Sequence, residues 1–413
     1  MIRIAALAAA LTLVAAPAFA QVVPAAEIAT AAEAVEADVV AWRRDLHAHP
    51  ELGLAETRTA AFVAGHLREM GLEVREGVGR TGVVGVLRGT GSGPQHVVAL
   101  RADMDALPVQ DVTGEPWAST VPGVAHACGH DVHTTALLGA ALALAELDER
   151  GELPGRVRLL FQPAEEVMPG GAKQLVAHGH LDDVVRVFAL HCDPAVDVGR
   201  VGMRTGPLTS AADKIEVHLE GTGGHTSRPH LTGDLTFALA KVTSELPAVL
   251  SRRMDPRAGV SVVWGVVRAG SAPNVIPDRG MVAGTVRILD AVAWTQCEPI
   301  IREAVHDIVR PYGVTATVDY LQGVPPVVND PGSNAILAAA VRAVLGPGGQ
   351  TSVPQSLGGE DFGWYVERVP GAMFRLGTRT PGGPTYDLHQ GNLRVDERAI
   401  AVGAKVLAMA AVS

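Results

Sequence analysis

The sequence has few cysteines, few charged residues and no run of basic residues. Only Cys128, Cys192 and Cys297 are present among 413 residues, and an odd number of widely separated cysteines does not make a disulfide framework. Charged residues make up 19% of the chain and its formal net charge is −10. Because no Lys/Arg-rich segment accompanies that charge, we expect no nucleic-acid partner. The hydrolase signatures H-E-x-x-H and G-x-S-x-G are also absent.

Long apolar runs are missing as well. Residues 1–20 combine Arg3, an apolar segment at residues 4–14 and the small-residue pattern at residues 18–20, which are features of a cleavable secretory signal. The apolar segment is short and rich in alanine, so a retained membrane anchor is the weaker interpretation. We therefore expect a signal peptide over residues 1–20, no membrane attachment after its removal, and a periplasmic or secreted location.

Helical and strand-like segments alternate over the first half of the chain. Helices are expected at residues 31–46, 57–70, 134–149 and 172–179, and strands at residues 83–87, 96–101, 156–161 and 184–190. This alternation predicts an α/β fold with a doubly wound, mostly parallel sheet that is covered on both faces. With 413 residues, the chain is long enough to build two domains, and with 47% hydrophobic residues it can give each a core.

The order of the predicted elements changes at residue 210. Between residues 210 and 322 it becomes β-α-β-β-α-β, which is the ferredoxin-like unit. Helices at residues 333–345 and 397–411 then resume the first pattern. We therefore expect one domain built from residues 21–209 and 323–413, interrupted by an inserted domain at residues 210–322.

The densest group of metal-binding residue types lies between His126 and His133. This stretch holds a thiol, three imidazoles and a carboxylate, which suit zinc, manganese or cobalt. Asp131 also suits the N-cap of the following helix, and Cys128 suits buried packing. The stretch alone leaves the metal and the structural interpretations open.

Further polar residues follow the predicted strands. They are Asp103, Asp105, Glu165, Glu166 and His191. In open α/β sheets, ligands bind beyond the carboxyl ends of the strands. A solvated loop or a core histidine would explain each residue alone, but together with the Cys/His stretch they favour a metal site.

Eight short segments carry a family resemblance. They are R-R-D-L-H at 43–47, R-A-D-M-D-A-L-P at 101–108, C-G-H-D-V-H at 128–133, Q-P-A-E-E at 162–166, G-G-H at 223–225, N-V-I-P-D at 274–278, G-G-E-D-F at 358–362 and L-H at 388–389. In this order they resemble the aminoacylase/carboxypeptidase-G family of dinuclear metallopeptidases. Within that family they resemble the N-acyl-amino-acid amidohydrolases, the branch that includes hippurate hydrolases and auxin-conjugate hydrolases. The resemblance runs from about residue 40 to the end of the chain.

The resemblance implies a site for two divalent metal ions, with manganese, zinc or cobalt as candidates. Its implied ligands are Cys128, His130, Glu166, His191 and His389. Glu165 would be the general base, and Asp105 would orient a ligand. Five protein ligands are more than one tetrahedral zinc site takes, which agrees with two metals. The thiolate of Cys128 would replace the bridging carboxylate used elsewhere in the family.

The resemblance also gives the insertion a role as a dimerisation and lid domain. It implies a homodimer in which His225 reaches the active site of the other subunit and stabilises the tetrahedral oxyanion. Asn274 and Arg287 become candidates for binding the free carboxylate of the substrate, Arg287 through a charge-assisted fork. By its sequence alone, Arg287 is equally typical of an ion pair on a sheet face.

These inferences predict a metal-dependent amidohydrolase that cleaves hippurate-like or N-acetyl amino acids to a carboxylate and a free amino acid. A dipeptidase or carboxypeptidase on the same scaffold is the alternative among enzymes. A non-catalytic metal- or peptide-binding protein is the alternative of another class, and we expect such a protein to lack the base Glu165. Residues 390–393 and Cys192 depart from the family pattern, which leaves the acyl specificity open.

Overall fold

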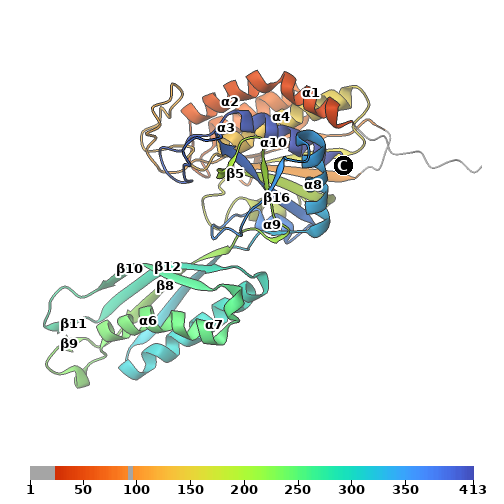
Figure 1. The fold of residues 1–413 in the computed structure, drawn as a ribbon. Coiled ribbons are helices and arrows are strands. Elements are labelled where there is room, and N and C mark those ends of the chain that lie inside the picture. The colour runs from red at the N-terminus through yellow and green to blue at the C-terminus, as the bar shows by residue number, and fades with distance from the viewer. Residues whose placement is uncertain (1–23, 92–95) are drawn as a thin grey trace, which may run out of the picture.

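The computed structural model describes residues 24–91 and 96–413. The predicted signal peptide at residues 1–20 lies outside the described residues. The chain forms a larger and a smaller unit, joined where β8 (Ala211–Glu220) leaves the larger unit and β13 (Thr315–Val324) returns to it (Figure 1). No helix among the described residues combines the length and the apolar character that a membrane span requires.

The larger unit is built on an eight-stranded sheet with the order β1-β2-β4-β3-β5-β16-β6-β15. Its strands are β1 (Glu73–Val78), β2 (Gly82–Leu87), β3 (Val97–Asp103), β4 (Arg156–Gln162), β5 (Val184–Asp197), β6 (Val201–Met203), β15 (Gln350–Ser352) and β16 (Gly371–Arg379). The central pairs β4–β3, β3–β5 and β5–β16 are parallel. At one edge, β1 and β2 pair antiparallel. The α/β fold with a mostly parallel sheet is therefore confirmed.

Helices cover both faces of this sheet, so its central strands are buried on both sides. One face carries α1 (Ala25–Ala34), α2 (Glu36–Ala48), α3 (Thr57–Glu69), α4 (His130–Glu149), α8 (Pro331–Leu345) and α10 (Arg398–Ala411). The other face carries the short helices α5 (Ala172–Ala177) and α9 (Gly363–Val366), which share a second apolar core with the sheet. Because polar side chains are costly to bury inside such layers, they gather where the strands end.

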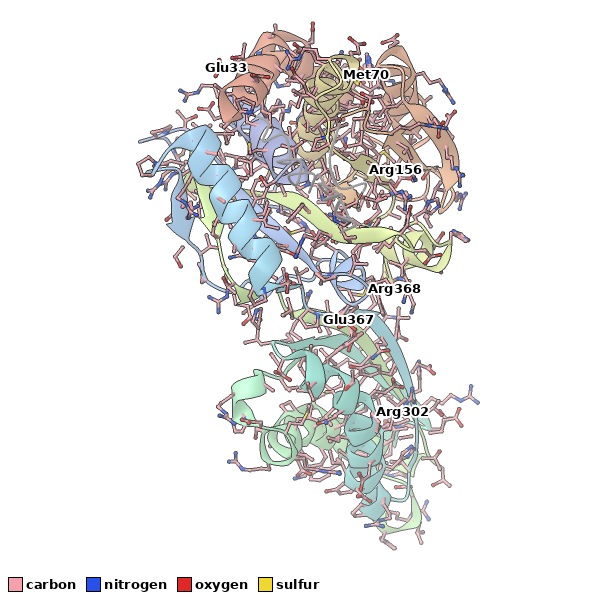
Figure 2. The ribbon with its side chains drawn as sticks, turned by 90° about the vertical axis from the view of Figure 1, so that its right-hand side faces the viewer. Glu33, Met70, Arg156, Arg302, Glu367 and Arg368 are labelled. Atoms are coloured by element: carbon pink, nitrogen blue, oxygen red, sulfur yellow. The ribbon has the colours of Figure 1, made fainter. Side chains whose placement is uncertain are left out.

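The smaller unit is a four-stranded antiparallel sheet with the order β10-β12-β8-β13. Its further elements are α6 (Leu235–Arg253), β10 (Ser261–Ala269), β12 (Arg279–Ile288) and α7 (Ala291–Val309). The chain order β8-α6-β10-β12-α7-β13 is the ferredoxin-like unit that the sequence predicted. Both helices pack on the sheet around an apolar core of their own. Figure 2 shows Arg302 of α7 in this unit, while Glu367 and Arg368 lie at the end of the larger unit that faces it.

A pair of very short strands lies at the far end of the smaller unit. The strands are β9 (Gly224–His225) and β11 (Val275–Ile276), which pair antiparallel. Figure 1 shows them at the end of the insertion that is farthest from the larger unit. We call this region, residues 223–232 and 270–278, the distal tip.

Helix α4 begins earlier than predicted, and Asp131 is not its N-cap. The helix starts at His130, and the N-cap is Gly129 with a φ of 91°. Asp131 instead lies buried in the first turn, where its Oδ2 is 2.8 Å from Nε of Arg43 and 2.7 Å from Nδ1 of His47. The sequence suggested a cap because aspartate is common there, but the buried cation of Arg43 holds this carboxylate within the helix.

Strand β5 also differs from its predicted bounds. It extends to Asp197 instead of ending at residue 190, because β16 pairs with it as far as the Arg379–Asp197 register. His191 therefore lies within a strand, not at the end of one. Its side chain still reaches the polar edge of the sheet, since the neighbouring β3 ends at Asp103.

Candidate metal centre

Side chains with metal-binding atoms gather where β3 and β4 end. Asp103 is the last residue of β3, Glu165 and Glu166 follow the end of β4, and His130 is the first residue of α4. His389 comes from the loop between β16 and α10. Segments far apart in the sequence thus converge on one edge of the sheet, which is where parallel sheets place their ligand sites.

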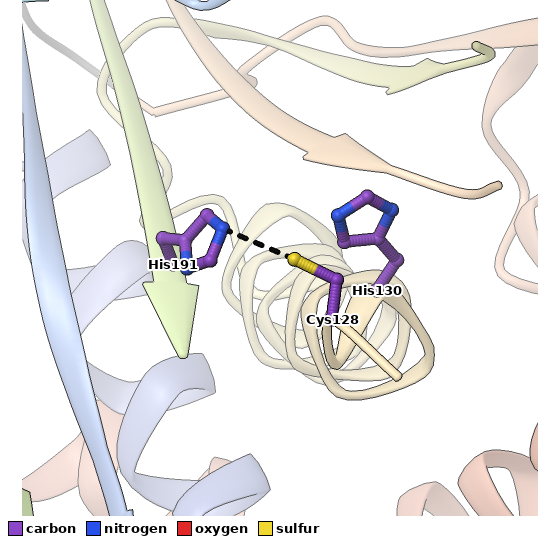
Figure 3. A group of neighbouring side chains, drawn as sticks. All are labelled: Cys128, His130 and His191. Carbon is purple, nitrogen blue, oxygen red and sulfur yellow. Dashed lines mark hydrogen bonds between the residues drawn. The ribbon is translucent and has the colours of Figure 1, made fainter. Parts of the chain in front are cut away.

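All five predicted metal ligands come together in two groups. Cys128, His130 and His191 form one group, and Cys128, Glu166 and His389 form the other; in each, the ligand atoms lie within 4.8 Å of one another. Figure 3 shows the first group, in which Sγ of Cys128 is 3.6 Å from Nε2 of His191. In the second group, Nε2 of His389 is 3.1 Å from Oε1 of Glu166. Since Cys128 belongs to both groups, the arrangement provides two adjacent sites with a shared sulfur.

The buried histidines of this cluster direct their Nε2 atoms into it. Nδ1 of His130 is 2.8 Å from the carbonyl oxygen of Asp105, and Nδ1 of His191 is 2.8 Å from that of Cys192. Because a carbonyl oxygen only accepts hydrogen bonds, each Nδ1 carries the proton and each Nε2 is unprotonated in the neutral ring. Nε2 of His130 is buried without a hydrogen-bond partner, and Oε1 of Glu166 has only Nε2 of His389 beside it, at 3.1 Å. Such open donors fit metal ions.

His133 is excluded as a ligand by its own hydrogen bonds. It lies within 4.8 Å of Asp103 and His130, which by distance alone makes another donor group. Its Nδ1, however, donates to Oδ1 of Asp103 over 2.6 Å, and its Nε2 accepts from the backbone N–H of Cys192 over 2.8 Å. Both ring nitrogens are therefore used. His126 is buried and belongs to none of the donor groups found in the described residues.

A tight turn directs the carboxylates of Glu165 and Glu166 to the same place. Ala164 has a φ of 54°, a left-handed conformation that residues other than glycine seldom adopt. The carboxylate of Asp105 accepts from the backbone N–H groups of Glu165 and Glu166, each over 3.0 Å. Asp105 thus fixes the turn through its carboxylate and His130 through its carbonyl oxygen. As a result, Oε2 of Glu165 lies 3.9 Å from Nε2 of His130.

Two acidic residues that we did not predict as site residues stand beside Glu165. Glu360 and Asp361 lie within 4.8 Å of it. Both form ion pairs with the fully buried guanidinium of Arg101, at 3.0 and 2.6 Å. Burial, and then the charges of Glu360, Glu166 and Asp361, raises the pKa of Glu165 well above its usual range. The signal in the sequence was the motif G-G-E-D-F at residues 358–362, which carried the family resemblance but gave no role for its acids.

The environment of the cluster shifts the pKa values of its predicted ligands. Burial raises the pKa of the Cys128 thiol, while hydrogen bonds to Cys128 and Glu166 raise the pKa of His389 to about 10. Burial, assisted by the positive charge of Arg375, lowers the pKa of His191 well below its usual range. Without metal, these shifts favour a protonated thiol at Cys128 and a protonated ring at His389. Metal binding to these atoms must therefore release protons.

The residues predicted in the insertion do not all lie together. His225 pairs with Val275 at the distal tip, and the N–H of Thr226 donates to the carbonyl oxygen of Asn274 over 3.2 Å. Arg287 lies at the opposite end of β12, where it is in register with Ala212. Its guanidinium is next to Gly359, at the junction with the larger unit. At about 3.4 Å per residue, β12 separates the tip from Arg287 by roughly 27 Å. Within one chain, His225 and Asn274 therefore lie together at the distal tip, whereas Arg287 lies at the junction between the two units.

Comparisons with known proteins show what this chain is similar to. The sequence model of the family described as "Peptidase family M20/M25/M40" matches residues 99–413. The chain is 37% identical over 370 residues to the N-acetyl-L-cysteine deacetylase of Bacillus subtilis, and the match covers 89% of this chain and 85% of that protein. It is 48% identical to a Rhodococcus jostii protein named "Putative glutamate--cysteine ligase 2-3", and it spans only 46% of that protein's length.

A solved structure shows the same fold. A Bacillus subtilis protein described as a dinuclear metal-binding peptidase from the M20 family superimposes with a TM-score of 0.78 at 33% sequence identity. The match covers 92% of this chain and 98% of that protein. Both the larger unit and the insertion are therefore included in the similarity.

Proposed function

Because the chain belongs to the peptidase family M20/M25/M40, a family of hydrolases, we propose that it is a metal-dependent amidohydrolase acting on N-acyl amino acids. Its products are a carboxylate and a free amino acid. The observation that carries the proposal is the pair of donor groups that share Cys128. Family membership also confirms the resemblance inferred from the eight sequence motifs.

The residues of the site fit two divalent ions. Cys128, His130 and His191 would hold one ion, and Cys128, Glu166 and His389 the other. Sulfur and imidazole favour zinc or cobalt, and the carboxylate of Glu166 also suits manganese. When bound, such ions polarise an amide carbonyl and lower the pKa of water from about 15.7 towards roughly 7.

Glu165 is the residue placed to move a proton. Its carboxylate is close to His130 and Glu166 but is not needed to complete either ligand group. A base in this position takes a proton from the attacking water at Oε2 and delivers it to the leaving amine. The turn fixed by Asp105 holds the carboxylate in place between these two steps.

Substrate binding requires residues that one chain does not bring to its own metal centre. His225 and Asn274 lie at the distal tip, far from the cluster. We propose that the protein is a homodimer in which the tip of one subunit completes the site of the other. In that arrangement His225 of the partner subunit stabilises the oxyanion. Asn274 of the partner subunit and Arg287 of the metal-binding subunit bind the free carboxylate of the substrate, Arg287 through a bidentate pair.

The decisive experiment replaces Glu165 by glutamine, which keeps the size of the side chain and removes the base. With manganese, zinc or cobalt added, Glu165→Gln should retain bound metal and lose about 100- to 10,000-fold in kcat on N-acetyl and N-benzoyl amino acids. Glu149→Gln, at an exposed position on α4, is the matched control and should keep its activity. Unchanged turnover in metal-loaded Glu165→Gln would refute the assigned base.

A dipeptidase or carboxypeptidase remains the alternative on this scaffold. Dipeptides differ from N-acyl amino acids by a free amino group, so matched pairs such as N-acetyl-alanine and glycyl-alanine separate the two activities. We expect a higher kcat/KM on the acylated member of each pair. A preference for the dipeptides would favour the alternative.

For the location, we propose export through the segment at residues 1–20. This rests on the sequence pattern of that segment alone. Expression of the full chain in a bacterial host, followed by mass determination of the exported protein, tests it. Retention of the intact amino terminus in the cytoplasmic fraction would contradict the proposal.

A further inference from the structure

A large cavity opens beside the metal centre and is not used by the mechanism above. It has a volume of about 920 Å³. Its wall includes Cys192, Leu388 and Gln390, the direct sequence neighbours of the predicted ligands His191 and His389. A substrate whose amide lies at the cluster can therefore extend one of its two halves into this cavity.

Arg375 forms part of the wall that is nearest to His191. It lies on β16 and is in register with His191 on the adjacent parallel strand β5. Residues in register on neighbouring strands lie about 4.8 Å apart and share a face of the sheet. On its other side, Arg375 is in register with Gly202 of β6. The side chain of Val353 packs over Gly202 and covers that flank, so Arg375 faces the cavity from the side of β5.

The guanidinium of Arg375 has no partner in the described part of the chain, although it is half-buried. The other arginines of the cavity are engaged: Arg379 pairs with Asp197 over 2.6 Å, and Arg200 donates to the carbonyl oxygen of Gln350. A partly desolvated cation without a counter-charge is unfavourable. The positive charge of Arg375 is therefore free for an anion that enters the cavity.

Acidic residues of the cavity wall do not neutralise Arg375. Asp193 accepts from the backbone N–H of Ala195 over 2.9 Å, and Asp387 accepts from that of Leu388 over 2.9 Å. Neither carboxylate lies within ion-pair distance of Arg375 in the described structure. Each carboxylate caps a local turn instead.

We propose that Arg375 binds a second carboxylate of the substrate, in addition to the free carboxylate of the amino acid. This inference rests on the proposed function and narrows it to N-acyl amino acids that carry another acidic group. That group sits either on the acyl chain or on the amino-acid side chain. In both cases the chemistry that Arg375 recognises is a carboxylate, held by charge-assisted hydrogen bonds.

The kinetic test compares acidic substrates with their neutral amides. One arm uses N-succinyl-alanine against its succinamoyl analogue, and the other uses N-acetylglutamate against N-acetylglutamine. In at least one arm, the wild-type protein should prefer the acid, and Arg375→Gln should reduce the acid-to-amide ratio of kcat/KM by about 10- to 100-fold. The loss should appear mainly in KM, and Arg375→Lys should restore part of it. The arm that responds identifies which half of the substrate enters the cavity.

Two comparisons keep this test specific. The neutral amides report any general damage to the site, since Arg375→Gln should leave their kcat/KM within about twofold. Arg156→Gln, exposed at the opposite end of β4, should alter neither ratio. If Arg375→Gln slows acids and amides equally, or if neither arm shows a preference that depends on Arg375, the proposal is wrong.

A binding measurement separates this inference from the proposed function. Calorimetric titration of the metal-free protein with glutarate, and with its monoamide, needs no turnover. Glutarate should bind more tightly than the monoamide, and Arg375→Gln should abolish that difference. If no N-acyl amino acid is hydrolysed, the proposed function fails and this titration alone decides on Arg375. Equal binding of the two ligands by the wild-type protein would overturn the role of Arg375.

Discussion

The metal centre and the distal tip of the insertion are built in opposite ways. At the centre, Cys128, His130 and His191 are buried, and hydrogen bonds fix the rings of both histidines. At the tip, His225 is exposed, and within the described part of the chain its ring hydrogen-bonds only to the neighbouring Ser227. One region is completed by its own chain, whereas the other presents polar groups to solvent.

Under the proposed function, this difference divides the work of the site between the two regions. A metal centre needs donors held with open lone pairs, and only a packed interior can keep them in place. A group that acts on the substrate from outside must instead remain free until the substrate binds. The contrast predicts that changes at the centre abolish metal binding, whereas changes at the tip leave the metal in place and reduce turnover.

The largest effect is expected from loss of the shared sulfur. Cys128→Ala removes a ligand from both donor groups, so metal content should fall and kcat should drop at least about 1,000-fold. Cys297→Ala, in the core of the insertion, is the control and should keep its metal content and its activity per folded molecule. Elemental analysis and kinetics on the same samples check both. Normal metal content in Cys128→Ala would remove the basis of the shared-ligand arrangement.

The next effect concerns the stability of the support beneath the centre. Arg43→Ala leaves the carboxylate of Asp131 buried without its cation, with an expected loss of about 3–5 kcal/mol in the free energy of unfolding. Arg253 makes a comparable ion pair with Glu303 on the surface of the insertion, and Arg253→Ala should cost about 0–1 kcal/mol. Denaturant titration of both variants measures the two losses. Similar losses of unfolding free energy in the two variants would show that the buried ion pair contributes no more than the exposed one.

At the tip, His225→Ala should lower kcat by about 100- to 1,000-fold, as loss of an oxyanion donor does. Its metal content should equal that of the wild type. Mixing His225→Ala with Glu165→Gln under subunit exchange should restore about a quarter of the wild-type activity, since half of the dimers are mixed and each has one intact site. Absence of complementation, with exchange demonstrated, would contradict a role across subunits.

The smallest effect tests whether the insertion is an independent folding unit. The side chain of Asp234 caps α6 by accepting from the N–H of Phe237 over 3.2 Å. Asp234→Ala should cost about 1 kcal/mol. Calorimetry should show this loss in the transition of the insertion, while the transition of the larger unit stays where it was. A uniform shift of a single transition would mean that the two units unfold together.

Much of the fold followed from local patterns. The alternation of helices and strands predicted the parallel sheet, and the β-α-β-β-α-β order predicted the ferredoxin-like insertion, because periodicity reports which faces are buried. The errors lay where tertiary contacts override local preference. Asp131 suited a cap but pairs with Arg43, and β5 runs past residue 190 because β16 continues to pair with it.

The candidate site was predictable to the extent that motifs carried it. The five predicted ligands come together in the structure, whereas Glu360 and Asp361 were part of a motif without an assigned role. No pattern in the sequence indicated a role for Arg375, because an arginine in an apolar strand does not show which residue of the neighbouring strand lies beside it. Its position beside His191 follows only from the register of β16 with β5.

The sequence by itself determined which atoms are available: a thiol, imidazoles and carboxylates, in an order that identifies the family. Only the tertiary structure decided how each is used. His130 and His191 direct their Nε2 lone pairs into the cluster because carbonyl oxygens accept from their Nδ1 atoms. In His133, both ring nitrogens form hydrogen bonds, with Asp103 and Cys192. The reason is that a hydrogen bond depends on distance and direction in space, and neither is encoded in the spacing of residues along the chain.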